Sequence, residues 1–285
     1  MLEAPTSLVR ALDPLVQRLA ADDDFYAHTV AGLLQSGLVH RDMRVLVACG
    51  GTLDKDVLSK LGFSNVTISN LDSRLSADEF EPYSWSYQDV ENLTFEDEAF
   101  DFAIVHNGLH HCHSPHRGLL ELYRVARTGV LVFEPRDTAL VRLGIRWSFG
   151  QKYEVASVTH NGLSAGGVGN TRIPNFIYRW TESEVEKTVL SYAPYGDPRF
   201  HFMYALPVPW SRLLSLRNPL FLTAVVAGMP ALKLLFRLFP KQANGFGFAI
   251  EKPRLPRDLH PWLRYDDNQI SVRDDWMRHR YAIGR

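Results

Sequence analysis

The stretch Val45-Leu-Val-Ala-Cys-Gly-Gly-Thr-Leu-Asp54 decides how the rest of this sequence is interpreted. Apolar and β-branched residues run into a Cys-Gly-Gly turn, and a polar segment typical of a helix start follows, with Thr52 as its expected cap. Glycines at such a junction let the backbone approach a ligand closely, and the helix start adds N–H donors. Because a Gly-Gly turn between strand and helix is also common without a ligand, its meaning depends on the strands that follow.

The composition is that of an ordinary globular protein. The chain has 285 residues, 46% hydrophobic and 22% charged, which is enough to bury a full core. A net charge of −1 gives no electrostatic footprint for nucleic acid, so we expect no such partner. Two cysteines, Cys49 and Cys112, cannot build a disulfide framework, and the first ten residues lack a signal-sequence pattern. We therefore expect a cytoplasmic protein.

Strand-like and helix-like segments alternate in the first half of the chain. Apolar or β-branched strands are predicted at 45–49, 65–70, 83–89, 100–105 and 130–133. The short polar joints between them indicate a doubly wound, mostly parallel α/β sheet with helices on both faces. This domain is expected over residues 41–252. Helices at 7–20 and 24–38 would form an N-terminal helical cover, residues 1–40.

The regular alternation stops after residue 140. Glycines gather between residues 150 and 169, so residues 137–180 are expected to form an insert or lid. Thr181-Glu-Ser-Glu184 is a capping box that should open a helix. Strands are expected at 200–205 and 246–250, and the tail, 253–285, as an extended segment packed on the domain by its aromatic residues.

The apolar segment 218–240 is interrupted by Pro230, Lys233 and Arg237. A spanning helix needs about 20 apolar residues in a row, and this run meets a charge too early. We expect a core-packed helix pair kinked at Pro230. A surface of residues 219–239 that dips into a membrane or captures a lipid-like substrate is the less favoured alternative.

Each predicted parallel strand ends in polar or glycine-rich residues. These ends are Cys49-Gly50-Gly51, Asn70-Leu71-Asp72, Asp89-Val90, His106-Asn107 and Glu134-Pro135. Ligands of open α/β sheets bind beyond the carboxyl ends of the strands, so the five ends predict one binding site. Asp72 also lies near the interval of about 20 residues after the glycine turn at which an acidic group meets a ribose. The alternative for Asp72 is the cap of a turn.

Three segments carry a family resemblance: Asp89-Val-Glu-Asn-Leu-Thr-Phe-Glu-Asp-Glu-Ala-Phe-Asp101, Gly108-Leu-His-His111, and Arg124-Val-Ala-Arg127 before Val130-Leu-Val-Phe-Glu-Pro135. They resemble the class I S-adenosylmethionine (SAM)-dependent methyltransferases, in particular the broad group related to quinone-biosynthesis methyltransferases. The resemblance covers about residues 40–136. It implies SAM as cofactor, S-adenosylhomocysteine as product, and a Rossmann-like seven-stranded sheet whose last strand, at 246–250, is antiparallel.

The resemblance also implies a role for each strand end. Ala48-Cys49-Gly50-Gly51 would lie against the methionine portion of SAM. Asn70 or Asp72 would meet the ribose hydroxyls, and Leu71 would pack on the adenine. The remaining positions are Asp89 at the adenine amino group, Val90 beside the ring, and His106 and Asn107 as the floor near the sulfonium.

The first motif departs from the acidic-x-Gly-x-Gly-x-Gly pattern of that family. Val47 stands at the acidic position and Cys49 replaces a glycine, while Asn70 takes the usual acidic position of the second strand. A charge-assisted hydrogen bond that is lost without compensation costs roughly 1.5–3 kcal/mol. Weaker binding, a different ligand, or compensation by Tyr26 and Asp54 are the outcomes left open.

Five of the eleven histidines fall within eleven positions: His106, His110, His111, His113 and His116. Consecutive histidines rarely converge on one ion and no second ligand set is clustered, so we expect no metal. Methyl transfer needs an aligned acceptor and the removal of its proton, for which a histidine is suited because its pKa lies near neutrality. His110 or His111 is our predicted catalytic base, with shaping of the pocket wall as the alternative.

The sequence thus predicts a SAM-dependent methyltransferase in a biosynthetic role, acting on oxygen rather than on nitrogen or carbon. The lid and the apolar segment suggest a bulky small-molecule acceptor: a glycan, a lipid-linked intermediate or a natural product. Candidate substrate residues are Tyr26, Glu134, Arg136 and Tyr153. The alternative is a binding or scaffold protein on the same fold, favoured by the altered first motif. A nicotinamide-dependent oxidoreductase is disfavoured because no Gly-x-Gly-x-x-Gly is present.

Overall fold

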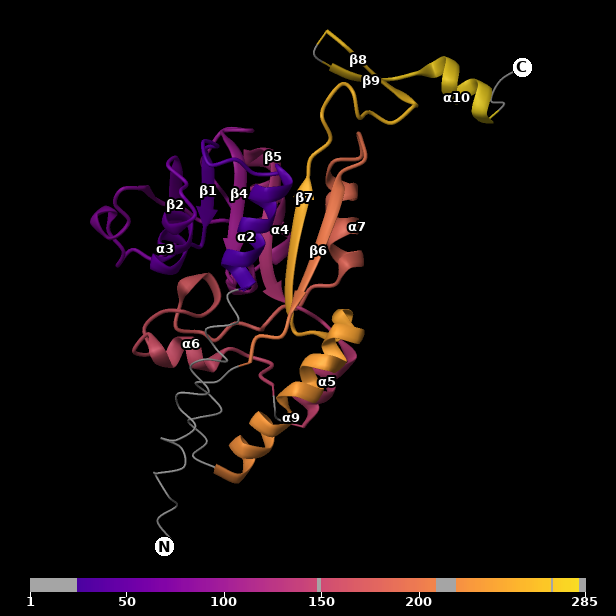
Figure 1. Cartoon of the computed structure of the whole chain (residues 1–285). Helices are drawn as coiled ribbons and strands as arrows, with labels where there is room; N and C mark the ends of the chain where they lie inside the picture. Colours follow the sequence, from indigo (N-terminus) through magenta and orange to yellow (C-terminus); the bar gives the residue numbers. More distant parts are fainter. Residues whose placement is uncertain (1–24, 148–149, 209–218, 268, 282–285) are drawn as a thin grey trace, which may run out of the picture.

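A seven-stranded sheet organises the computed structural model, which describes residues 25–147, 150–208, 219–267 and 269–281 (Figure 1). Its strand order is β3-β2-β1-β4-β5-β7-β6. The strands are β1 (Val45–Ala48), β2 (Val66–Asn70), β3 (Ser84–Tyr87), β4 (Phe100–His106), β5 (Ala126–Pro135), β6 (Arg199–Ala205) and β7 (Gly245–Glu251). Neighbours among β1 to β5 pair in parallel, and β7 runs antiparallel to both β5 and β6. The predicted Rossmann-like fold with an antiparallel last strand is confirmed.

Helices cover both faces of the sheet (Figure 1). The α-helices are α2 (Phe25–Ser36), α3 (Thr52–Lys60), α4 (Pro115–Val125), α5 (Ala139–Arg146), α6 (Val155–His160), α7 (Glu182–Tyr192), α9 (Pro219–Leu238) and α10 (Asp274–Tyr281). Short 3-10 turns occur at η1 (Ala77–Glu79), η2 (Leu109–His111), η3 (Val168–Asn170) and η4 (Pro240–Gln242). A separate hairpin consists of β8 (Leu263–Asp266) and β9 (Gln269–Val272).

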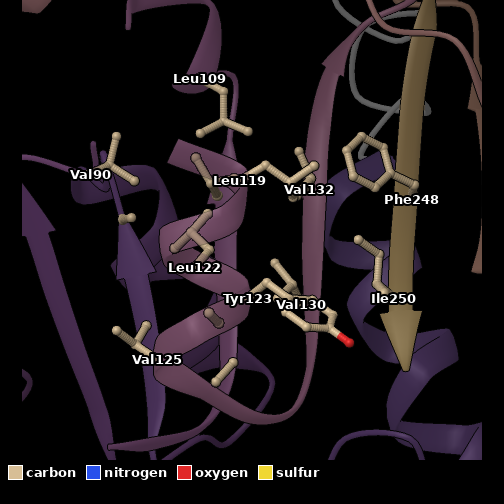
Figure 2. Packing of buried hydrophobic residues seen from close by; sticks show 14 of the residues in the cluster. Val90, Leu109, Leu119, Leu122, Tyr123, Val125, Val130, Val132, Phe248 and Ile250 are labelled. Atoms are coloured by element: carbon tan, nitrogen blue, oxygen red, sulfur yellow. The ribbon is translucent and has the colours of Figure 1, made fainter. Parts of the chain in front are cut away.

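Alternation of side chains along the strands creates two cores. Leu46 and Ala48 of β1 point to one core, which α4 and α7 complete, whereas Val45 and Val47 point to the other, which α2 and α3 complete. Figure 2 shows the first of these, where α4 packs on β4 and β5 and side chains of β7 complete the cluster. Its labelled side chains are Val90, Leu109, Leu119, Leu122, Tyr123, Val125, Val130, Val132, Phe248 and Ile250. Burial on both faces explains why these strands are continuously apolar.

Helix starts follow the capping signals in the sequence, with one correction. The Ser114 hydroxyl accepts the Arg117 N–H at the start of α4, and Thr181 forms the expected capping box with Glu184. Thr52, however, is the first residue of α3 and does not cap it. Gly51 is the N-cap, because the Asp54 carboxylate reaches back to the Gly51 N–H at 2.8 Å.

The segments outside the sheet depart most from expectation. The helix predicted at 7–20 lies outside the described residues, whereas α2 confirms the second one. The lid contains α5, α6 and η3 and is therefore not a plain loop. The tail contacts the domain where His260 donates to the Tyr195 carbonyl, but its hairpin and α10 extend away from the sheet (Figure 1). The packing of the whole tail on the domain therefore stays a prediction.

The apolar segment is the clearest correction. It forms one continuous helix, α9, with Pro230 inside it, instead of a kinked pair. Leu222 and Met229 are buried in a small cluster of their own, but most of the helix is exposed. Only 11% of its most apolar 18-residue window is buried, so the expected core packing does not occur.

Candidate functional site

The turns after β1 and β4 touch each other and form the base of the site. Cys49 and Asn107 both have a φ of 53°, which ends each strand abruptly. A side chain at Gly108 would place its Cβ 2.4 Å from the Cβ of Cys49, so this position requires glycine. Burial, aided by the charge of Glu134, raises the pKa of the Cys49 thiol to about 12, which keeps it neutral.

The two glycines of the opening stretch have different roles. A Cβ at Gly50 would meet Ile68 Cγ2 at 2.8 Å, so this glycine allows tight packing of the turn. A Cβ at Gly51 would meet no atom within 4 Å, so its backbone faces open space that a ligand can approach. Behind it lies the buried Asp54. Burial raises the pKa of this carboxyl group, against the lowering effect of the Gly51 N–H and of nearby His106.

Tyr26 of α2 closes this end of the site. Its ring stacks on the ring of His106 at a centroid distance of 4.6 Å and an interplanar angle of 9°, and both rings pack edge-on against Phe133. Both residues also act on Asp54, because His106 and the Tyr26 hydroxyl lower the pKa of its carboxyl group. Tyr26 and Asp54, the two residues expected to compensate for the altered motif, therefore meet beside the predicted floor residue His106.

The polar side chains at the end of β2, Asn70 and Asp72, bind other groups of the protein. The Asn70 amide donates to the Gly50 carbonyl at 2.9 Å and its oxygen accepts the Asp72 N–H at 3.1 Å. The Asp72 carboxylate pairs with the Arg74 guanidinium at 2.6 Å, and this contact lowers the pKa of Asp72. The adjacent Leu71 is half-buried. Asn70 thus fixes the glycine turn, and Asp72 already has a charged partner.

The end of β3 leaves a carboxylate partly open. Asp89 is half-buried, and one of its oxygens accepts the Glu91 N–H at 2.9 Å. Val90 beside it belongs to the first core. Glu91, which the sequence did not single out, accepts the N–H groups of His113 and Ser114 at 2.8 Å each and so holds the loop after β4 against this end.

Buried charges converge where β4 and β5 end. The side chain of Glu134 is fully buried and accepts the Leu109 N–H and the His110 Nδ1–H, both at 2.6 Å. On its other side, His110 Nε2 lies 3.1 Å from Glu154 Oε2. Burial lowers the pKa of His110, but the two carboxylates outweigh this effect and raise it to about 10. His110 is therefore protonated at neutral pH.

His111 has the opposite character. Its Nε2 lies 3.4 Å from Glu154 Oε2, and its side chain keeps 26% of its exposure. Burial and the positive charge of His110 lower the pKa of His111, so its ring is neutral at neutral pH. Burial raises the pKa of Glu154, but bonding to His110 overcomes this effect and lowers it to about 2. The two carboxylates and one imidazolium leave a net charge of −1 beside His111.

The same three residues are the group of described residues whose ligand atoms could hold a metal ion. His110, His111 and Glu154 each offer one ligand atom, and these atoms lie within 4.8 Å of one another. The sequence predicts no metal because neighbouring histidines rarely converge, yet here they do. Protonated His110 already supplies a cation between Glu134 and Glu154, so the carboxylates have a charged partner without an ion.

The lid reaches the site through side chains that sequence reasoning missed. Asn175 donates to the His110 carbonyl at 2.9 Å, Asn170 to the Leu71 carbonyl at 3.2 Å, and Asn161 accepts from Arg74 at 2.9 Å. Together with Glu154, these residues tie residues 151–178 across the ends of β2 and β4. The glycine-rich composition predicted a lid, but no local signal identifies which of its residues reach inward.

The substrate candidates separate into an internal and an accessible group. Arg136 is buried, pairs with Glu182, donates to the Lys241 carbonyl, and lies over the rings of Tyr204 and Phe246. Arg136 therefore fastens the end of β5, as Glu134 fixes His110. Tyr153, by contrast, is exposed on the lid, where its ring packs edge-on against Phe176.

A broad depression of about 1500 Å³ lies elsewhere, at the amino ends of the strands. Ser36, His40, Arg127, His201 and Tyr265 are among its lining residues. None of the predicted strand-end residues lines it. Ligand chemistry in open α/β sheets occurs at the carboxyl ends, and the clustered titratable groups are found there.

Comparison with known proteins identifies a family match over part of the chain. Residues 45–133 match the family model described as "Methyltransferase domain". This segment runs from β1 to β5 and contains the glycine turn, Asp89 and His110. No curated protein matches the chain.

Solved structures give weaker likenesses. A candidate methyltransferase from Bacillus halodurans C-125 is 15% identical, covers 79% of this chain and 98% of its own, and has a TM-score of 0.46. Phosphoethanolamine N-methyltransferase 2 from Haemonchus contortus, in complex with phosphomonomethylethanolamine and S-adenosylhomocysteine, is 14% identical and has a TM-score of 0.46. That match covers 80% of this chain and 52% of the other. At TM-scores below 0.5, these likenesses carry no argument about function.

Proposed function

Since this chain carries a class I SAM-dependent methyltransferase domain, we propose that it transfers a methyl group from SAM to a hydroxyl group of a bulky, lipid-like or glycan-like acceptor, with His111 as the base. The observation that supports the chemistry is the split between two adjacent histidines. His110 is held protonated by Glu134 and Glu154, whereas His111 is neutral and partly exposed.

The residues of the first motif fit SAM in spite of the altered sequence. Gly51 offers its backbone to open space at the start of α3, where N–H donors suit a carboxylate. Asp89 offers a partly open carboxylate to the adenine amino group, and the buried carboxyl group of Asp54 lies behind the Gly51 turn. Asn70 holds the turn, and Leu71 and Val90 provide apolar surface beside it. The proposed ribose partner, Asp72, would have to share its carboxylate with Arg74.

When bound, SAM supplies a methyl group on a positively charged sulfur, and its transfer to an acceptor oxygen leaves a neutral thioether and releases the hydroxyl proton. The imidazole ring of His111 is the group that we assign to take this proton. Protonation of His111 brings the cluster of Glu134, Glu154, His110 and His111 from −1 to zero net charge, and Glu154 stabilises the new imidazolium at 3.4 Å. His110 orients Glu154 for this purpose and is a positioning residue.

The acceptor class rests on the surroundings of the site. Helix α6 of the lid and the helices α5 and α9 border the same edge of the sheet (Figure 1), and Tyr153 of the lid is exposed, so a bulky acceptor with an apolar portion fits best. We further propose that residues 41–252 form the catalytic domain and that the enzyme has a biosynthetic role.

Ligand-dependent thermal melting tests the cofactor. A ligand at 100 times its dissociation constant stabilises by about 2.7 kcal/mol, so SAM and S-adenosylhomocysteine should raise the melting temperature while NAD should not. Asp89→Ala should abolish the shift, and Glu98→Ala, an exposed carboxylate outside the site, should preserve it. No shift with either sulfur compound at millimolar concentration would refute the proposal.

The binding or scaffold alternative is favoured by one observation, since Asn70 and Asp72 are both engaged internally. It predicts a shift with SAM but no turnover of any acceptor. His111→Gln separates the two functions. In an enzyme this variant should bind SAM normally and lose about 10²–10⁴-fold in kcat, whereas a binding protein shows no activity to lose.

A further inference from the structure

Two helices project from the edge of the sheet that carries the site (Figure 1). We call them the α5/α9 lobe, residues 138–147 and 219–241. The lobe is fixed at its base, where the Thr138 hydroxyl donates to the Gln242 carbonyl at 3.3 Å and Arg136 donates to the Lys241 carbonyl. Helix α5 begins five residues after Glu134, so the lobe and the His110 cluster share the end of β5.

The lobe exposes large apolar side chains to an unusual extent. Leu220 is 82% exposed, Leu234 58%, Leu238 65% and Phe239 57% on or just after α9, and Trp147 at the end of α5 is 62% exposed. Scattered apolar residues on a surface are ordinary, but this many large exposed side chains on two helices that project from one edge indicate a binding surface. By length and composition α9 could even cross a membrane, with a mean hydropathy of 1.6 over Leu220–Leu238.

The charges of the lobe have one sign. No Asp or Glu occurs in residues 138–153 or in residues 198–250. Arg142 pairs with Asp137 at the base, but Arg146, Lys233 and Arg237 are exposed and make no ion pair with another described residue. Apolar side chains interleaved with unpaired cations suit an anionic lipid surface, where the apolar groups enter the acyl region and the cations meet the phosphates.

The connections of α9 to the sheet favour a helix that inserts into one face of a bilayer over one that crosses it. The chain leaves the sheet at Ala205 and re-enters it at Gly245, and these two residues pair in register on β6 and β7. The segment between them is therefore a loop anchored at both ends on one edge of the sheet. Lys233, Arg237 and the internal Pro230 lie in the half of α9 nearer to its return. Such a helix suits the plane of the bilayer interface.

We propose that the α5/α9 lobe docks this protein on an anionic lipid bilayer and that the acceptor is a lipid taken from that bilayer. Docking follows from the lobe alone, whereas the identity of the acceptor rests on the proposed function. The site faces the same side as the lobe, so a lipid headgroup can reach His111 while its apolar chains remain in or near the membrane.

Vesicle flotation of the full chain tests the docking without any need for turnover. The protein should float with vesicles of phosphatidylcholine and 30% phosphatidylglycerol, less with phosphatidylcholine alone, and less as salt rises. The Lys233→Glu, Arg237→Glu double variant should lose more than about 25-fold in affinity for the anionic vesicles, because each cation near the surface contributes about fivefold. The Leu234→Glu, Leu238→Glu double variant should lose binding to both compositions.

A matched control comes from α7, away from the lobe. Lys187 and Leu190 are exposed there, so Lys187→Glu with Leu190→Glu makes the same kinds of change and should leave flotation unchanged. Melting temperatures establish that each variant is folded. If the wild-type chain does not float with anionic vesicles, or if the lobe variants float as it does, the proposal is wrong. A chain that instead forms a dimer disrupted by the leucine variants would show that a second copy covers the lobe.

The outcomes also separate the two proposals. Flotation without a thermal shift by SAM would uphold docking and refute the methyltransferase function. A thermal shift by SAM without flotation would refute docking and leave the methyltransferase function standing. If both hold, extracted lipids should accept methyl groups from labelled SAM, and the lobe variants should lose activity on vesicles while keeping the SAM shift.

Discussion

Raising the pH from 6.5 to 9 should remove about 3 kcal/mol from the free energy of unfolding. His110 titrates near 6.5 in an unfolded chain but at about 10 in the folded protein, because Glu134 and Glu154 favour its charged form more than burial disfavours it. Between these values the folded state holds a proton that the unfolded state has lost. Each pH unit in the window therefore costs about 1.4 kcal/mol, and the contribution is fully present only below pH 6.5.

At acid pH, the free energy of unfolding depends on the other member of the His110–Glu154 ion pair. Glu154 has a pKa lowered from 4.5 to about 2, so its contribution is present above pH 4.5 and is lost as the pH falls toward 2. The two effects describe one ion pair and do not add at a single pH. Maximum stability from this cluster is therefore expected between about pH 4.5 and 6.5.

Urea unfolding at intervals between pH 4 and 9 provides the measurement, with a constant slope m as the check that the denatured state is unchanged. Glu154→Gln keeps a hydrogen-bond acceptor but removes one charge. It should flatten the acid limb and make the alkaline limb shallower. A wild-type profile that stays level within about 0.5 kcal/mol from pH 6.5 to 9 would show that His110 is neutral, and the assignment of roles to the two histidines would fail.

Three further outcomes test the site. The rate of methyl transfer should be level between pH 7 and 8 and fall about tenfold per unit below the pKa of His111, which lies under 6.5; an alkaline shift of this limb would show that His110 is the base. EDTA should leave turnover unchanged after dialysis, because His110 supplies the cation between the carboxylates; activity restored only by added metal would contradict this. Gly108→Ala should weaken SAM binding at least tenfold by calorimetry because its Cβ would lie 2.4 Å from Cys49, whereas Gly32→Ala, which meets nothing within 4 Å, should bind normally.

The sheet could be predicted because its signals are local. Apolar runs, glycine turns and caps such as Ser114 lie within a few residues of the elements that they define, and both faces of the strands read as apolar because both are covered. Because the strands are parallel, their carboxyl ends had to lie together at one edge of the sheet. The shift of the α3 cap from Thr52 to Gly51 is a one-residue error of the kind that such signals do not resolve.

The chemistry of the site depended on partners that the sequence does not connect. His110 and His111 were chosen as a pair, but the difference between them arises from Glu154, more than forty residues away on the lid. Asp72 could have been discounted, because Arg74 follows it by two residues and can reach back. The exposure of α9 left no local signal, since a helix that is apolar all round looks alike in a core and at a membrane.

The origin of Glu154 on the lid implies that catalysis and closure are coupled. Glu154 lies 3.1 Å from His110 Nε2 and 3.4 Å from His111 Nε2, so the proposed base has this environment only when residues 151–178 lie across the strand ends. Asn170 and Asn161 fasten the same lid over the end of β2, next to the proposed ribose position. If the lid covers the proposed cofactor position, the proposed acceptor would enter from the side where α5 lies. A lid that binds the cofactor and completes the base before the acceptor enters would make SAM bind first, so product inhibition by S-adenosylhomocysteine should be competitive with SAM.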